Sequence, residues 1–246
     1  RLAADGAHVL VHGRNETRGR EVVEEIERQG SGSAQFYRAD LASLAEVRQL
    51  AEQIRRDHDR LDLLVNNAGI WITEGERQLS QDGYELHFHV NYLAGYLLTH
   101  QLLPLLERSA AARIVNVASG AQTPIDFNDV QLEREYSGSR AYAQSKLAQI
   151  LFTIDLAEQL ASRGIVVASL HPATFMATDM VREAGITPRS TVEEGADAVM
   201  NLIESRQVES GSYYSGLQPS RPSPQALDAE ARQRLRTLSE QLVQTN

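Results

Sequence analysis

The chain has 246 residues, no cysteine and a formal net charge of −9 at pH 7. The negative charge argues against nucleic acid or an anionic membrane as a partner, and the lack of cysteine excludes disulfides, thiolate metal sites and a thiol nucleophile. No apolar run approaches the roughly 18 residues of a membrane-spanning helix, so we expect no membrane insertion and a cytoplasmic protein.

Strand and helix patterns alternate along the chain. In order they are a strand at 7–12, a helix at 16–29, a strand at 33–37, a helix at 44–60, a strand at 61–65, a helix within 79–106, a strand at 114–117, a helix around Tyr142, a strand at 165–170, a helix at 191–204, a strand at 213–214 and a helix at 224–243. This alternation is typical of an α/β fold, a doubly wound parallel sheet with helices on both faces. We expect one domain over residues 1–246.

Tyr142 and Lys146 are four residues apart on a predicted helix, so their side chains share one face. An ammonium at about 4 Å, in an effective dielectric near 20, supplies roughly the free energy that lowers a phenol pKa from about 10 to about 7. We therefore expect Lys146 to lower the pKa of Tyr142, while the neutral hydroxyl of Ser119 orients a substrate oxygen. On its own, this spacing also fits an ordinary solvated helix face.

Three further segments accompany this pair. A predicted strand ends at Ser119, another ends in the Asn-Asn-Ala-Gly turn at 66–69, and Asn91 lies on a long apolar helix. In identity and order these elements resemble the active site of the short-chain dehydrogenases/reductases, and particularly their retinol-dehydrogenase-like branch. The resemblance covers essentially the whole chain. It implies a Rossmann-like fold and hydride exchange between a nicotinamide cofactor and an alcohol or carbonyl compound.

The resemblance also implies roles for the four residues Asn91, Ser119, Tyr142 and Lys146. Tyr142 would be the general acid in carbonyl reduction or the base in alcohol oxidation, and Lys146 would also bind the nicotinamide ribose. Ser119 would hold the substrate oxygen, and Asn91 would support Lys146 through a water. As alternatives, Asn91 is a buried amide that braces its helix and Ser119 is a satisfied hydroxyl at a strand end.

The loop after the first predicted strand bears on the choice of cofactor. Gly13 stands where an NAD-preferring protein carries an acidic residue, and Arg14 follows it. Because a guanidinium can pair with a 2′-phosphate, we predict NADP(H), bound by Arg14 and Asn15, with NAD(H) as the alternative. The other interpretation is that Arg14 is an ordinary loop cation and Asn15 caps the next helix.

The resemblance supplies the remaining cofactor contacts. They lie after the predicted strands and comprise Asp40 and Leu41 at the adenine, Asn67, Ala68 and Gly69 at its ribose, Tyr142 and Lys146, and Pro172 and Thr174 at the nicotinamide. Asp40 is nearly as good a candidate for capping the next helix, and the 67–69 turn could be structural. The chain departs from the family pattern at Ala173, which replaces a glycine, and at Thr178, which lies one residue late.

The family's glycine-rich phosphate loop, Thr-Gly-x-x-x-Gly-x-Gly, has no counterpart in this chain. Residues 1–6 read as the last turn of the helix that follows that loop. We therefore expect an N-terminally truncated domain that lacks its first strand and should fold poorly, from a longer gene product or a damaged reading frame. A non-catalytic fragment or binding protein of this fold is the alternative function, and an isomerase or lyase fits the four residues less well.

Several residues bear on the substrate, which we expect to be a small or lipophilic aldehyde, ketone or alcohol. Trp71 lines the mouth of the site or simply packs. Apolar residues at 175, 176, 180, 181 and 186 form a lid or an ordinary core, and a loop with Asp126, Asp129, Glu133 and Glu135 lies near the mouth. A homo-oligomer paired through the helices of Asn91 and Tyr142 is compatible with the resemblance, and the sequence leaves the oligomeric state open.

Overall fold

The computed structural model describes residues 1–244, and its strands form two sheets. In the first sheet β1 (His8–Gly13) pairs in parallel with β2 (Ser33–Arg38). The second sheet contains, in spatial order, β3 (Leu63–Asn66), β4 (Arg113–Val117), β5 (Val166–His171), β6 (Tyr213–Ser215) and β7 (Gln218–Ser220). Every pair is parallel except β6 with β7, which is antiparallel.

The predicted fold class is confirmed, but the sheet is divided. Among the described residues β1 has β2 as its one partner and β3 has β4 as its one partner. Within residues 1–244 each sheet is therefore open, with edge strands β1 and β2 in the first and β3 and β7 in the second. The sequence predicted a single sheet without its first strand, and the structure has two sheets with open edges at β1 and β3.

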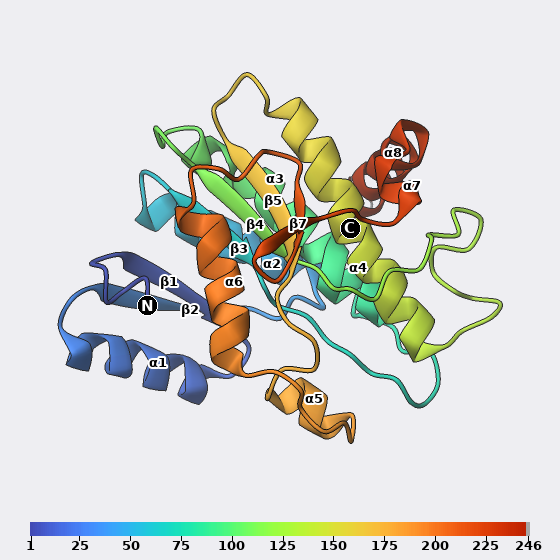
Figure 1. Ribbon diagram of the computed structural model, residues 1–246, viewed down its shortest axis with the longest axis horizontal. Helices are drawn as coiled ribbons and strands as arrows, with labels where there is room; N and C mark the ends of the chain where they lie inside the picture. The colour runs from blue at the N-terminus through green and yellow to red at the C-terminus, as the bar shows by residue number, and fades with distance from the viewer. Residues whose placement is uncertain (245–246) are drawn as a thin grey trace.

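The helices lie over both faces of these sheets. They are α1 (Glu16–Gln29), α2 (Leu44–Asp57), α3 (Ala94–Leu106), α4 (Gly138–Gln159), α5 (Asp179–Glu183), α6 (Val192–Glu204), α7 (Pro224–Leu227) and α8 (Ala229–Gln244). Figure 1 shows β1, β2 and α1 together at the blue end of the chain, α6 in front of the second sheet, and α4 beside α8.

Alternation along β4 builds two cores. Ile114 belongs to a large apolar cluster with residues of α2, α3 and α4, whereas Val115 and Val117 belong to a smaller cluster with Ala198 and Leu202 of α6. Successive side chains of a strand point to opposite faces, so one short strand anchors helices on both sides. The packing of Ile114 in the larger cluster fixes the position of α4 relative to β4.

Local signals explain the elements that the sequence predicted well. The helix predicted at 16–29 is α1, because the Asn15 side chain accepts a hydrogen bond from the backbone of Arg18 and Gly30 ends the helix with a φ of 74°. Other elements differ from the prediction. The terminal helix is split into α7 and α8 by the extended backbone of Asp228.

The long helix predicted within 79–106 begins later and opens with a π-helix, η1 (Phe88–Leu93), that continues into α3. Glu85 sets this start, since its carboxylate accepts hydrogen bonds from the backbone N–H groups of His87 and Phe88. π-Helical turns are frequent at functional sites. Asn91 lies within this π-helix.

His89 of η1 is fully buried, and neither of its ring nitrogens has a hydrogen-bond partner in the described part of the chain. Burial lowers its pKa to about 4, although the carboxylates of Asp82 and Asp40 act in the opposite direction. Between pH 4 and the ordinary value of 6.5 the unfolded chain therefore binds more protons than the folded protein.

We predict that the free energy of unfolding falls as the pH drops through this window, by up to about 1.4 kcal/mol per pH unit from His89. A His89→Leu variant should show a shallower decline. Urea unfolding at about pH 7 and about pH 5 measures the difference. Equal pH dependence in the two proteins would contradict the assignment.

Candidate active site

A cavity of about 660 Å³ opens where the parallel strands end. Its walls come from the loops that follow β1, β2, β3, β4 and β5, together with one face of α4. The carboxyl ends of parallel strands meet at the same edge of a sheet, which is where open α/β folds bind ligands. Both sheets therefore contribute to one site.

Tyr142 and Lys146 of α4 both line this cavity, so the predicted common face is confirmed. Lys146 Nζ lies 5.8 Å from the centre of the Tyr142 ring. The ammonium is nearly fully buried and donates hydrogen bonds to Val117 O (2.9 Å) and Gln149 Oε1 (3.0 Å). Lys146 thereby connects α4 to the end of β4.

The electrostatics of this pair differ from the expectation. Burial lowers the pKa of Lys146 to about 7, so the amine is not a fixed cation at neutral pH. Burial also raises the pKa of Tyr142, and a hydrogen bond with Ser119 only partly opposes that effect. The predicted lowering of the Tyr142 pKa by Lys146 is therefore wrong for the protein groups alone, because burial raises this pKa more than the hydrogen bond with Ser119 lowers it.

Ser119 lies just beyond β4, is nearly buried and faces the cavity. Its Oγ accepts a hydrogen bond from the backbone of Ala121 (3.1 Å), and its carbonyl accepts one from the Tyr213 hydroxyl (3.0 Å). Both contacts use Ser119 oxygens as acceptors. The Ser119 hydroxyl therefore keeps its proton for a donor role toward Tyr142 or a substrate oxygen.

Asn91 does not line the cavity. Its Oδ1 accepts a hydrogen bond from the Ile70 backbone (2.7 Å), and its Nδ2 donates to Ile70 O (3.1 Å) and to Ser145 Oγ (2.9 Å). The alternative interpretation, a buried amide that braces its surroundings, describes these contacts. A Cβ on Gly69 would lie 3.2 Å from Asn91 Oδ1 and 3.3 Å from Lys146 Nζ, so only glycine leaves these two groups undisturbed.

Most of the predicted cofactor residues line the cavity, namely Arg14, Asp40, Leu41, Asn67, Ala68, Gly69, Pro172 and Thr174. Asn15 does not, because its side chain caps α1. Asp40 does not cap the next helix, a role that Ser43 fills; instead Asp40 Oδ1 accepts a hydrogen bond from the backbone of Ala42. Arg14 is exposed and forms no hydrogen bond or ion pair within residues 1–244.

Three aromatic or imidazole side chains complete the wall. The sequence left Trp71 and Phe175 open between lining the site and ordinary packing, and it did not single out His171. The Trp71 ring stacks on Phe175 with centroids 6.2 Å apart and lies 5.6 Å from the Tyr142 ring. Phe175 has a φ of 49°, in the left-handed region. His171 Nε2 lies 3.0 Å from Thr174 Oγ1, next to Gly120.

Of the other residues expected near the substrate, most of the apolar ones line the cavity and the acidic ones do not. Met176, Thr178, Met180 and Val181 line the cavity, whereas Ile186 does not. The acidic loop lies away from the lining, where Asp126 pairs with Arg140 and Asp129 with Arg134. Asp126 therefore connects the loop to α4, and Asp129 pairs within the loop.

The comparisons with known proteins agree with this geometry. A model of the short chain dehydrogenase family matches residues 1–188. Retinol dehydrogenase 13 of Mus musculus is 36% identical over 233 residues, which cover 84% of this chain and 67% of that protein. Human retinol dehydrogenase 12 is 34% identical, over 98% of this chain and 80% of its own length. The resemblance to the retinol-dehydrogenase-like branch is confirmed.

Solved structures share the fold. An uncharacterized protein from Mycobacterium paratuberculosis superposes with a TM-score of 0.74 and 28% identity, over 98% of this chain and 94% of that one. An NADPH-bound carbonyl reductase from chicken fatty liver has a TM-score of 0.63 at 23% identity, over 86% and 85% of the two chains, and this likeness shows the fold alone.

Within residues 1–244, no helix is both long and apolar enough to cross a membrane. The same residues contain no group of three or more acidic or histidine side chains placed to hold a metal ion.

The lowered pKa of Lys146 makes stability depend on pH above neutrality. Between pH 7 and the ordinary value of 10.5 the unfolded chain binds the proton that the folded protein has lost. We predict that the free energy of unfolding rises with pH in this window and that Lys146→Met removes a slope of up to about 1.4 kcal/mol per pH unit. Urea unfolding at about pH 7 and about pH 9 tests this, with Tyr142→Phe as the control that keeps the amine.

Proposed function

The chain belongs to the short-chain dehydrogenase/reductase family of NAD(P)-dependent oxidoreductases, and we propose that it interconverts a small or lipophilic aldehyde or ketone and its alcohol with NADP(H). The observation that carries this proposal is the convergence of Ser119, Tyr142 and Lys146 on one cavity. A donor hydroxyl, a phenol and a buried amine are the groups that a proton transfer to a carbonyl oxygen requires.

The cavity fits a dinucleotide at both ends. At one end Arg14 offers a guanidinium that has no hydrogen-bond or ion-pair partner within residues 1–244, which suits a 2′-phosphate. At the other end Gly69 leaves free the space that a side chain would take beside Lys146 and Asn91. Asp40, Leu41, Asn67, Ala68, Pro172 and Thr174 would hold the molecule between these ends. When bound, the nicotinamide supplies or accepts the hydride.

The protein groups then move the proton. We assign to Tyr142 the role of general acid, with its Oη donating to the carbonyl oxygen, and to Ser119 the role of a second donor that orients this oxygen. A raised pKa keeps the phenol protonated at neutral pH, and a protonated phenol is the form that carbonyl reduction uses. Lys146 lies one helical turn from Tyr142 on α4. Because its pKa is about 7, its amine can gain or lose a proton near neutral pH.

The lining beyond Tyr142 supports an apolar substrate. Trp71, Phe175, Met176, Met180 and Val181 surround this part of the cavity. Apolar and aromatic walls with few polar groups favour ligands that bury hydrocarbon, while Ser119 and Tyr142 provide the two polar contacts for one oxygen. A lipophilic carbonyl compound matches both features.

We predict that Tyr142→Phe lowers kcat for aldehyde reduction roughly 100-fold to 10,000-fold, because the general acid is lost. The KM for NADPH should change little. The measurement is the loss of NADPH absorbance with the full chain and a panel of aldehydes. Tyr136→Phe, a neighbouring tyrosine outside the cavity, is the matched control. An unchanged rate in Tyr142→Phe would refute the acid role, and NADPH binding without turnover of any aldehyde would favour a binding protein.

The proposed cofactor preference depends on Arg14. Replacing it with glutamine should raise the KM for NADPH about 10-fold to 100-fold, since one charge-assisted hydrogen bond is lost. The KM for NADH should stay the same, because NADH lacks the phosphate. Arg20→Gln, an exposed arginine on α1 paired with Glu16, is the control. Equal effects on the two cofactors would contradict the assignment.

A further inference from the structure

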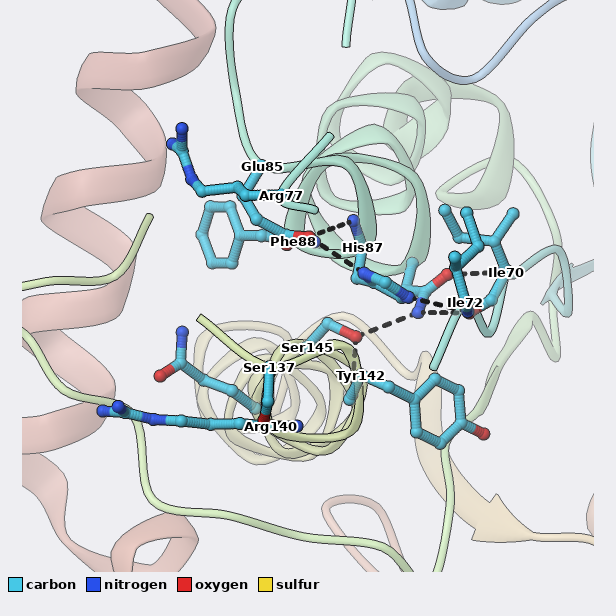
Figure 2. A network of polar contacts seen from close by, with 12 residues as sticks. Ile70, Ile72, Arg77, Glu85, His87, Phe88, Ser137, Arg140, Tyr142 and Ser145 are labelled. Carbon is cyan, nitrogen blue, oxygen red and sulfur yellow. Dashed lines mark hydrogen bonds and ion pairs between the residues drawn. The ribbon is translucent and has the colours of Figure 1, made fainter. Parts of the chain in front are cut away.

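A buried carboxylate and a buried imidazole lie behind the active site. Glu85 and His87 each have a relative exposure of 1%. Glu85 Oε1 lies 2.9 Å from His87 Nδ1 and also accepts the His87 backbone N–H, while Glu85 Oε2 accepts the Phe88 N–H. Figure 2 shows these groups joined by dashed lines above α4, with the Tyr142 side chain projecting from the side of the helix below Ile70 and Ile72.

The hydrogen bonds define the tautomer of His87. The backbone N–H of Ile72 donates to His87 Nε2 (3.0 Å), so Nε2 is unprotonated. The proton of the neutral ring is then on Nδ1, where it is donated to the Glu85 carboxylate. Glu85 thus holds His87 in the form that can accept from Ile72.

Ile72 belongs to the segment 70–73, whose backbone is held by hydrogen bonds on either side of Trp71. On one side Asn91 bonds to both backbone groups of Ile70, and on the other side His87 bonds to the N–H of Ile72. Gly138 at the start of α4 packs so close to the Ile72 carbonyl that any Cβ would overlap it. Trp71 is therefore fixed on a short backbone segment between three anchors.

We propose that His87, oriented by Glu85, is a positioning residue that holds Trp71 against Phe175 and Tyr142 and so sets the width of the substrate cavity. The effect on catalysis rests on the function proposed above. His87 itself does not line the cavity, so it acts through the Ile72 backbone. Its loss should loosen Trp71 and weaken binding of bulky carbonyl substrates more than that of small ones.

Trp71 is the only tryptophan of the chain, so the tryptophan fluorescence of the full protein, excited selectively over that of the tyrosines, reports on this segment alone. We expect His87→Leu to shift the emission to longer wavelength and to increase quenching by acrylamide. His87→Gln should restore the native spectrum, because its amide oxygen can accept from Ile72. His89→Leu is the matched control, since it removes a buried histidine only two residues further along the chain that makes no hydrogen bond within residues 1–244.

Kinetics supply the second measurement. We expect His87→Leu to raise the KM for a bulky aldehyde about fivefold, the factor expected for one lost neutral hydrogen bond, with little change in kcat. In a Trp71→Leu background the same substitution should leave this KM unchanged, because its effect passes through Trp71.

Each result has a defined meaning. Native emission and native acrylamide quenching in a folded His87→Leu variant would overturn the proposal. Equal spectral effects of His87→Leu and His89→Leu would overturn it too. So would a rise in KM that His87→Leu still causes in the Trp71→Leu background. If His87→Leu does not fold, His87→Gln and His87→Asn replace that variant. The asparagine side chain is too short to reach the Ile72 N–H, so identical emission spectra for these two variants would also overturn the proposal. The fluorescence needs no turnover, so its outcome is independent of the proposed function.

Discussion

The buried amine of Lys146 is the constraint on which the site depends. Its two acceptors are the carbonyl of Val117, at the end of β4, and the side chain of Gln149, on its own helix. A buried amine that loses such partners costs free energy, so a shift of α4 along β4 would leave a buried donor unpaired. The hydrogen bond from Lys146 to Val117 thus fixes Tyr142 relative to Ser119, because Tyr142 lies on α4 and Ser119 follows β4.

Much of the fold could be predicted because its signals are local. The cap of Asn15 and the left-handed Gly30 set both ends of α1, and the apolar stretch of β4 is short and unambiguous. The misses depend on tertiary contacts. The strand β7 is polar, exposed and contains Pro219, so no pattern marks it, and the late start of η1 depends on the side chain of Glu85.

The site divides in the same way. Spacing alone brought Tyr142 and Lys146 to one face, but it could not give the direction of the Tyr142 pKa, which depends on how much water the fold removes. Asn91 Oδ1 and Lys146 Nζ both border Gly69, yet the hydrogen bonds of Asn91 go to Ile70 and Ser145. Nothing in the sequence marked His87, since a glutamate and a histidine two residues apart are equally common on surfaces.

Lys146 is the single lysine among the 24 basic residues of the chain, and every other one is arginine. A lysine-specific protease therefore has one peptide bond to attack, in the middle of α4 and inside the core. Cleavage at this bond requires that α4 first leave its place between the sheet and α8. The rate of cleavage therefore measures how often the core around α4 opens.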